Sequence, residues 1–151
     1  MQLTIPTGIS RVGRQPILDR KLNIYGYELL YRADEAFKET GFDGDLATAR
    51  TLLDGFLEFG LQRLVGSHKA FINMTRIFFT ELQPLPVDKT SVVIEVLENI
   101  ELTPEVVNGV SKLHSDGFVI ALDDYKFESR WNPVLPHCSI LKVDVLNLDL
   151  H

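Results

Sequence analysis

The sequence has only one cysteine, Cys138, and its four histidines are scattered without the spacing of metal ligands. One thiol cannot form an intramolecular disulfide, so the sequence fits a reducing compartment. No apolar run approaches the roughly 20 residues that a membrane-spanning helix needs. Residues 1–6 lack the basic start and the apolar core of a signal peptide. We therefore expect a cytoplasmic protein that has no membrane partner.

Positive charge is also scarce, since 15 Lys and Arg residues stand against 21 Asp and Glu residues and give a formal net charge of −6. A broad face for DNA or RNA needs the opposite balance, so neither is an expected partner. The composition, 45% hydrophobic and 24% charged, is typical of a globular protein. The 151 residues are enough for one domain with a real core.

Residues 91–125 have the most regular pattern in the chain. Residues 92–94 are all β-branched and residues 118–122 form a second apolar run, as is typical of strands buried on both faces. Between the two runs, Thr103 can cap a helix and Pro104 suits the first helical position. Strand, helix and strand at this length predict a parallel βαβ crossover.

The N-terminal part predicts a hairpin followed by a long helix. Residues 9–17 and 24–32 have strand patterns, and the short polar link between them favours antiparallel pairing. Residues 33–45 are charged and aperiodic, which indicates a surface loop. Residues 46–65 repeat apolar side chains at intervals of three and four, which predicts a helix that ends at Gly66.

The remaining segments complete an alternation of strands and helices. Residues 70–74 predict a short strand, residues 75–82 one or two helical turns, residues 126–138 a loop and residues 139–145 a last strand. Together these segments predict five parallel strands with helices outside them. A closed barrel of eight β/α units takes about 250 residues. This chain is therefore expected to be the first half or so of a barrel, or a smaller open α/β sheet.

Polar side chains recur at or near the carboxyl ends of the predicted strands. They are Glu28, Asn73, Glu95, Asp123, Asp124, Lys142 and Asp144. The carboxyl ends of parallel strands share one edge, where α/β proteins bind ligands. Crowded carboxylates need a positive partner, and oxygen ligands favour a hard cation such as Mg²⁺ or Mn²⁺. Lys142 could orient a water or neutralise a phosphate oxygen, and Arg32 could hold a phosphate.

Most of these residues also have a simpler interpretation. Glu28 could face solvent, Asn73 could cap the following turn, and the pair Asp123 and Asp124 could start a turn or cap a helix. Lys142 could only pair with a neighbouring acid. The hypothesis of a shared site therefore rests on the recurrence of polar residues along one edge.

Glu95 is harder to explain without a site, because Ile94 and Val96 flank it and an unpaired buried acid is costly. Glu98 and Glu101 are expected to be solvated. The histidines are expected at the surface or at caps, and Cys138 is expected to be a packed thiol.

Five short motifs, in the order in which they occur along the chain, resemble those of the EAL domains, the cyclic di-GMP phosphodiesterases. Glu28-Leu29-Leu30-Tyr31-Arg32 resembles their Glu-Ala-Leu-x-Arg signature, and the others are Phe71-Ile72-Asn73-Met74-Thr75, Val93-Ile94-Glu95-Val96-Leu97-Glu98, Ala121-Leu122-Asp123-Asp124-Tyr125 and Leu141-Lys142-Val143-Asp144. Residues 13–19 and 26–32 are most similar to the EAL half of the EAL–HDOD signalling proteins.

The resemblance implies a TIM-like (β/α) barrel of EAL type whose first strand runs antiparallel. Residues 1–151 would form the N-terminal part of that barrel, without its C-terminal strands. The implied metal ligands are Glu28, Asn73, Glu95, Asp123 and Asp124. Lys142 and Glu28 would be catalytic, and Arg32, Leu30 and Asp144 would contact the dinucleotide. The implied reaction is attack of water, activated by Mg²⁺ or Mn²⁺, on one phosphodiester to give the linear dinucleotide.

Three departures from the family pattern shape the expected function. Leu29 replaces the signature Ala, residues 126–130 replace a Gly-Thr-Gly loop, and no counterpart of the family's later glutamate and glutamine appears before His151. We expect a degenerate EAL-type domain with weak or no phosphodiesterase activity, which acts in signal transduction by binding nucleotide or protein partners. The alternatives are an active phosphodiesterase when full length, and an interaction module that binds no nucleotide.

The expected assembly follows from the incomplete barrel. Exposed sheet edges and an apolar interior favour pairing with another surface, so we expect a homodimer, or an exchange of elements between chains, to cover them. The resemblance to EAL–HDOD proteins further implies an HDOD domain in the parent chain.

Overall fold

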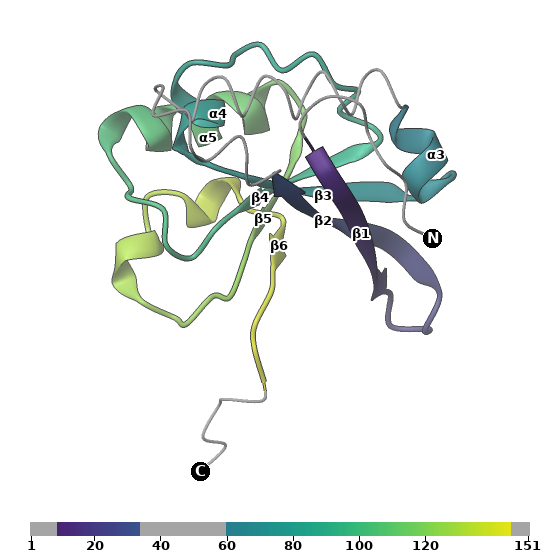
Figure 1. Cartoon of the computed structure of the whole chain (residues 1–151). Coiled ribbons are helices and arrows are strands. Elements are labelled where there is room, and N and C mark those ends of the chain that lie inside the picture. Colours follow the sequence, from purple (N-terminus) through teal and green to yellow (C-terminus); the bar gives the residue numbers. More distant parts are fainter. Residues whose placement is uncertain (1–8, 34–59, 146–151) are drawn as a thin grey trace.

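The computed structural model describes residues 9–33 and 60–145, with the backbone alone at residues 9–11 and 31–33. Its centre is a six-stranded sheet in the order β1-β2-β3-β4-β5-β6 (Figure 1). The strands are β1 (Ile9–Leu18), β2 (Ile24–Ala33), β3 (Lys69–Met74), β4 (Val92–Val96), β5 (Val119–Leu122) and β6 (Ile140–Leu141). The helices are α3 (Leu61–Val65), α4 (Arg76–Thr80) and α5 (Pro104–Ser115), and two 3-10 turns span Ser129–Trp131 and Leu135–His137.

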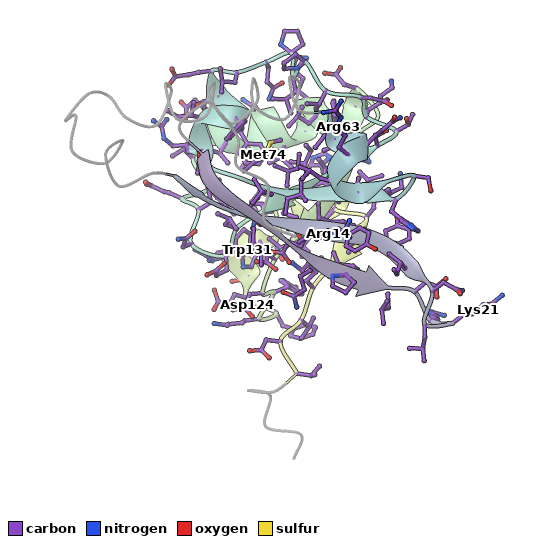
Figure 2. The ribbon with its side chains drawn as sticks, turned by 45° about the vertical axis from the view of Figure 1, so that its right-hand side comes forward. Arg14, Lys21, Arg63, Met74, Asp124 and Trp131 are labelled. Atoms are coloured by element: carbon purple, nitrogen blue, oxygen red, sulfur yellow. The ribbon has the colours of Figure 1, made fainter. Side chains whose placement is uncertain are left out.

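The pairing of the strands confirms the predicted topology. Strands β1 and β2 form an antiparallel hairpin, and β2 to β6 are parallel to one another. Lys21 lies at the tip of the hairpin and points away from the rest of the molecule (Figure 2). The helices between the parallel strands make the described part a half-barrel, which is the predicted first part of a TIM-like barrel.

The two faces of the sheet differ in what covers them. Alternate strand residues such as Ile72, Ile94 and Ile120 pack with α4 and α5 in the main core, and Met74 points to this helix side (Figures 1 and 2). A smaller cluster on the opposite face consists of Phe71, Val93 and Ala121, with partly buried Ile17, Val119 and Ile140 beside it. This second face corresponds to the interior of the barrel and carries the polar residues of the site.

Helix α5 begins where the sequence predicts. The Oγ1 atom of Thr103 accepts a hydrogen bond of 3.4 Å from the backbone N–H of Val106, and Pro104 is the first helical residue. At Gly109 the helix touches α4 so closely that a Cβ atom would lie 2.1 Å from the carbonyl oxygen of Phe79. Only a glycine allows this contact, which fixes how the two helices pack.

Two predicted elements differ in length from those observed. The long helix predicted over residues 46–65 does not pass through Gly60, whose φ of 73° and ψ of 112° are not helical, and α3 begins at Leu61. Residues 46–59 and the loop predicted over residues 34–45 lie outside the described residues. The last strand is shorter than predicted, because its neighbour β5 ends at Leu122 and leaves β6 only two paired residues.

Within the described ranges, no helix has both the length and the apolar character needed to cross a membrane.

Candidate functional site

The site is organised around the ammonium group of Lys142, which contacts carboxylates from three different strands or strand ends. Its Nζ atom lies 2.7 Å from Oε1 of Glu95, 2.8 Å from Oδ1 of Asp123 and 3.0 Å from Oε2 of Glu28. These are the distances of charge-assisted hydrogen bonds. Asn73 joins the group through its Nδ2 atom, which donates to Oε1 of Glu28 at 3.2 Å.

Strand register explains why these side chains meet. Asn73 is paired with Glu95 across β3 and β4, and Glu28 is paired with Phe71 two residues earlier on β3. Paired residues of parallel strands and residues two apart on one strand share a face. Glu28, Asn73 and Glu95 therefore all point to the barrel-interior face, and Asp123 follows directly at the end of β5.

Lys142 is held in place by backbone hydrogen bonds even though it lies beyond β6. Its N–H donates to the carbonyl of Leu122 at 2.9 Å, and its own carbonyl accepts from the N–H of Tyr125 at 2.8 Å. The segment after β6 thus stays beside the end of β5. This contact positions the lysine side chain over the carboxylates of Glu28 on β2, Glu95 on β4 and Asp123 at the end of β5.

Glu95 is the most unusual acid of the group, because it has no exposed surface. Burial raises the pKa of Glu95 to about 7, although the hydrogen bond and the charge of Lys142 act in the opposite direction. Its second oxygen, Oε2, is buried and has no hydrogen-bond partner. A buried carboxylate oxygen left in this way is costly unless something positive or a donor reaches it.

The pKa of Lys142 is also shifted, in the direction that favours its charged form. Burial lowers the pKa of Lys142, but the hydrogen bonds to Asp123, Glu95 and Glu28 outweigh burial and leave that pKa above its ordinary value. The lysine is therefore a permanent cation. With all three acids ionised, one positive charge faces three negative charges, so the group retains an excess of negative charge.

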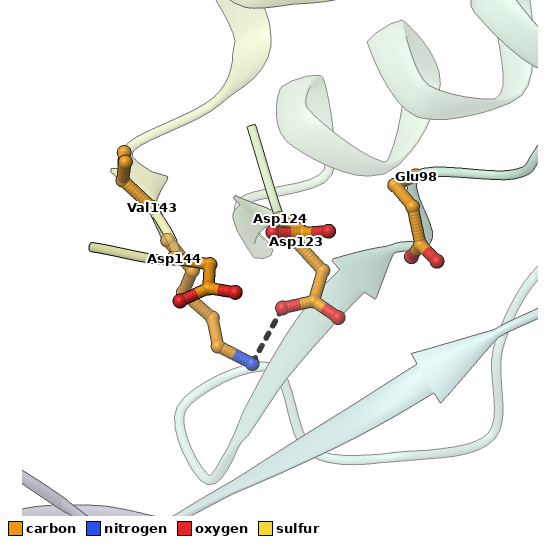
Figure 3. Close-up of a pocket in the computed structure, with 6 residues that line it drawn as sticks. Glu98, Asp123, Asp124, Val143 and Asp144 are labelled. Carbon is orange, nitrogen blue, oxygen red and sulfur yellow. Dashed lines mark ion pairs between the residues drawn. The ribbon is translucent and has the colours of Figure 1, made fainter. Parts of the chain in front are cut away.

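A pocket of about 380 Å³ opens beside this group. It is lined by Glu98, Asp123, Asp124, Lys142, Val143 and Asp144 (Figure 3). Figure 3 draws the ion pair between Lys142 and Asp123 as a dashed line, together with the side chains of Glu98, Asp124 and Asp144. Four acids and one base in the wall make the pocket strongly acidic. An anionic ligand could therefore bind here only together with a cation.

Glu98 corrects one expectation from the sequence. It was expected to be solvated, but it is partly buried and forms part of the pocket wall. It follows β4 by two residues and therefore stands at the carboxyl edge like the other site residues. The available signal was its place at the end of the EAL-like motif of residues 93–98, three residues after Glu95. The guanidinium of Arg130 donates to the carbonyl of Glu98 and ties this edge to the loop after β5.

Asp124 lies in the pocket wall but makes a different contact from Asp123. Its φ of 46° is in the left-handed region, and its Oδ2 lies 3.4 Å from Nζ of Lys126. Lys126 belongs to the charged loop of residues 126–130, which stands where the resemblance to EAL domains predicts a glycine-rich loop. In that loop Arg130 also pairs with Glu128 at 3.2 Å and lies 4.2 Å over the ring of buried Trp131.

The residues predicted to contact a dinucleotide have different outcomes. Asp144 is exposed and lines the pocket. Leu30 is 46% exposed on β2, two residues after Glu28 and therefore on the same face. The side chain of Arg32 lies outside the described residues, so its predicted phosphate contact stays a prediction.

The donor set of the site suits a hard divalent cation, although its oxygens now surround an ammonium group. In the described part of the chain, no three or more His, Cys, Asp or Glu side chains are already arranged to hold a metal ion. The carboxylate oxygens of Glu28, Glu95 and Asp123 are nevertheless of the type that Mg²⁺, Mn²⁺ and Ca²⁺ prefer. The buried Oε2 of Glu95, which lacks a hydrogen-bond partner, fits a cation ligand. These residues therefore fit a metal ion if the ammonium group of Lys142 moves away from the carboxylate oxygens.

Comparisons with known proteins connect this geometry with one group of proteins. No family model matches the chain. The cyclic di-GMP phosphodiesterase CdgJ of Vibrio cholerae is 35% identical over 141 residues, which are 92% of this chain and 32% of CdgJ. A standalone EAL protein of Vibrio cholerae, solved with cyclic di-GMP bound, superimposes with a TM-score of 0.57 at 21% identity, over 88% of this chain and 65% of that one. The chain has the fold of an EAL domain.

A further solved structure agrees with this assignment. BlrP1 of Klebsiella pneumoniae, in complex with calcium and cyclic di-GMP, superimposes with a TM-score of 0.62 at 18% identity, over 95% of this chain and 43% of BlrP1. The predicted EAL-type half-barrel is thus confirmed. The chain spans about a third of the length of CdgJ.

Proposed function

We propose that this EAL-type domain binds cyclic di-GMP in the pocket beside Lys142, together with a divalent cation, and serves signal transduction with weak or no hydrolysis. The single observation that carries the proposal is the convergence of Glu28, Glu95 and Asp123 on one point at the edge of this pocket. The relationship to CdgJ, and the cyclic di-GMP complexes among the structures of the same fold, indicate the ligand.

The charge of the pocket is the reason for including a cation. A cyclic dinucleotide carries two phosphodiester anions, which the acidic wall would repel. Glu28, Asn73, Glu95 and Asp123 would hold the cation, with Asp124 and Asp144 at the rim. When bound, Mg²⁺ or Mn²⁺ would neutralise phosphate charge and lower the pKa of water. BlrP1, which has the same fold, was solved with calcium and cyclic di-GMP.

The charged loop after β5 favours binding over rapid turnover. Asp124, a predicted metal ligand, pairs with Lys126 of this loop at 3.4 Å. A carboxylate that is paired with a lysine is less available to complete the coordination of a metal ion. The site would therefore hold the metal with fewer of its predicted ligands.

The second candidate is an active phosphodiesterase that hydrolyses one phosphodiester of cyclic di-GMP within a longer protein. The specific observation that favours it is the 35% identity to CdgJ, a phosphodiesterase, over nearly the whole of this chain. The same longer protein would carry the proposed HDOD domain and protein partners. Exposed Leu141 and Val145 beside the outer edge of the sheet favour the proposed homodimer. We place the protein in the cytoplasm on the basis of its composition.

Calorimetric titration with cyclic di-GMP, in Mn²⁺ and then in a chelator, tests the proposal. We expect binding that depends on the metal, is lost in Glu95→Gln and is kept in Glu101→Gln, which removes the same charge from an exposed position outside the pocket. Absence of binding by the wild-type chain would refute the proposal. Parallel chromatography of the nucleotide distinguishes the two candidates, because rapid formation of linear dinucleotide would favour the phosphodiesterase.

A further inference from the structure

We propose that Lys142 is a built-in competitor of the divalent cation, so that metal binding drives its ammonium group out of the carboxylate cluster and into the nucleotide pocket. The inference rests on the proposed function, because it assumes that Glu28, Glu95 and Asp123 take a metal. It adds a regulatory step to that site: the metal binds first and releases the lysine that then meets the phosphodiester.

The first argument is the shared set of oxygen atoms. The Nζ atom of Lys142 lies 2.7 to 3.0 Å from one oxygen of each of three acids, and no two of them belong to the same element of the chain. Metal–oxygen bonds are shorter, about 2.0–2.1 Å for Mg²⁺ and about 2.3–2.6 Å for Ca²⁺. A cation held by these three acids would need the same oxygens at shorter distances, and it would repel the ammonium group at close range.

The second argument is that a divalent cation can displace the ammonium group of Lys142 from the carboxylate oxygens. One ammonium group leaves the three carboxylates with an excess of negative charge, and it reaches only one oxygen of Glu95. The other oxygen, buried Oε2, has no hydrogen-bond partner. A cation with two charges and several coordination positions satisfies more of these oxygens than Lys142 does.

The third argument concerns where the lysine can go. Two backbone hydrogen bonds, to the carbonyl of Leu122 and from the N–H of Tyr125, anchor the main chain of Lys142. Its side chain, in contrast, is 27% exposed and forms part of the pocket wall. Rotation about the four-carbon stem therefore carries the ammonium group toward Asp144 and the pocket while the backbone stays in place. There it can contact a phosphate oxygen.

Titration of the full chain with Mn²⁺ alone, without nucleotide, tests the competition directly. We expect Lys142→Met to bind Mn²⁺ at least roughly tenfold more tightly than the wild type, because a positive charge that opposes the ion at short range is gone. Lys112→Met is the matched control: it removes the same charge from an exposed lysine of α5 that pairs with Asp116, and the Mn²⁺ affinity of this variant should equal that of the wild type. Equal or weaker binding by Lys142→Met would overturn the proposal.

Two further measurements keep the test decisive if Lys142→Met folds poorly. Lys142→Arg keeps the charge and should bind Mn²⁺ as weakly as the wild type; tighter binding would contradict competition. In the wild type, amine labelling followed by mass spectrometry should show faster modification of Lys142 when Mn²⁺ is added, with Lys112 as the internal reference. Unchanged labelling at saturating Mn²⁺ would also overturn the proposal.

The outcomes separate this inference from the proposed function. If cyclic di-GMP binds in a Mn²⁺-dependent way but Lys142→Met and the wild type have the same Mn²⁺ affinity, the proposed function is supported and the competition is refuted. If Lys142→Met binds Mn²⁺ more tightly than the wild type but no nucleotide binds, the competition is supported and the proposed function is refuted.

Discussion

The Nζ atom of Lys142 lies 2.7 Å from Oε1 of Glu95, a residue 47 positions earlier in the chain and fully buried. The pair joins the centre of the sheet at β4 to the segment that follows β6. Its two members do not have equal partners. Lys142 contacts two further acids, whereas within residues 9–33 and 60–145 the Glu95 side chain has Lys142 as its one cationic partner. The two halves of the pair should therefore respond differently to substitution.

We predict that Glu95→Gln is tolerated and Lys142→Met is not. The glutamine keeps the shape of the side chain and removes a buried charge, while Lys142 keeps Glu28 and Asp123 as partners. The methionine instead leaves three carboxylates without their cation, which should cost about 3–5 kcal/mol of unfolding free energy. Urea unfolding in chelator, followed by circular dichroism, measures both. A larger loss in Glu95→Gln than in Lys142→Met would contradict this explanation.

The raised pKa of Glu95 predicts how stability depends on pH. Burial raises the pKa to about 7 from 4.5, so the folded state binds a proton more tightly than the unfolded state. Between these two values the folded state holds more protons, and the free energy of unfolding must fall as pH rises. In Glu95→Gln this contribution is absent. Thermal unfolding in chelator from pH 5 to pH 8 should therefore show a smaller decline for the variant, and parallel profiles would rule out the assignment.

A different prediction concerns the packing of α4 on α5. Gly109→Ala places a Cβ atom 2.1 Å from the carbonyl oxygen of Phe79, a backbone atom that cannot move without shifting the helix. Overpacking of this kind costs roughly 1–3 kcal/mol. Gly13→Ala is the control, because its nearest neighbours lie 3.7 Å away and its position is exposed. Chemical denaturation should show destabilisation in the first variant alone; equal stabilities would mean that the helices separate easily.

Sequence patterns predicted the parts of this fold that depend on short-range chemistry. Thr103 and Pro104 marked the start of α5, and β-branched residues marked β4. The helix predicted through Gly60 was wrong there, because apolar spacing does not record the backbone angles that a glycine can adopt. The end of β6 was overestimated for a related reason, since its length depends on a partner strand that stops at Leu122.

The sequence predicted which residues form the site, but it did not predict how these residues contact one another. Strand register brings Glu28, Asn73 and Glu95 to one face, as an alternating pattern requires. Nothing in the spacing of residues distinguishes Asp123, which pairs with Lys142, from Asp124, whose left-handed backbone goes with a pairing to Lys126. The same limit applies to Glu98, whose place in the pocket wall depends on the path of the chain after β4.

The single thiol provides a test of core packing that is independent of the site. Burial raises the pKa of Cys138 to about 11, and its Sγ donates to the carbonyl of Val134 at 3.3 Å. The thiolate is the reactive form, so at pH 8 the folded protein should react with iodoacetamide roughly a hundredfold more slowly than the chain unfolded in urea. The folded rate should keep rising with pH beyond 9, whereas an unperturbed thiol levels off there. Mass spectrometry of quenched samples measures both rates, and comparable rates in the folded and unfolded states would show that the turns spanning Ser129–Trp131 and Leu135–His137 do not shield the thiol.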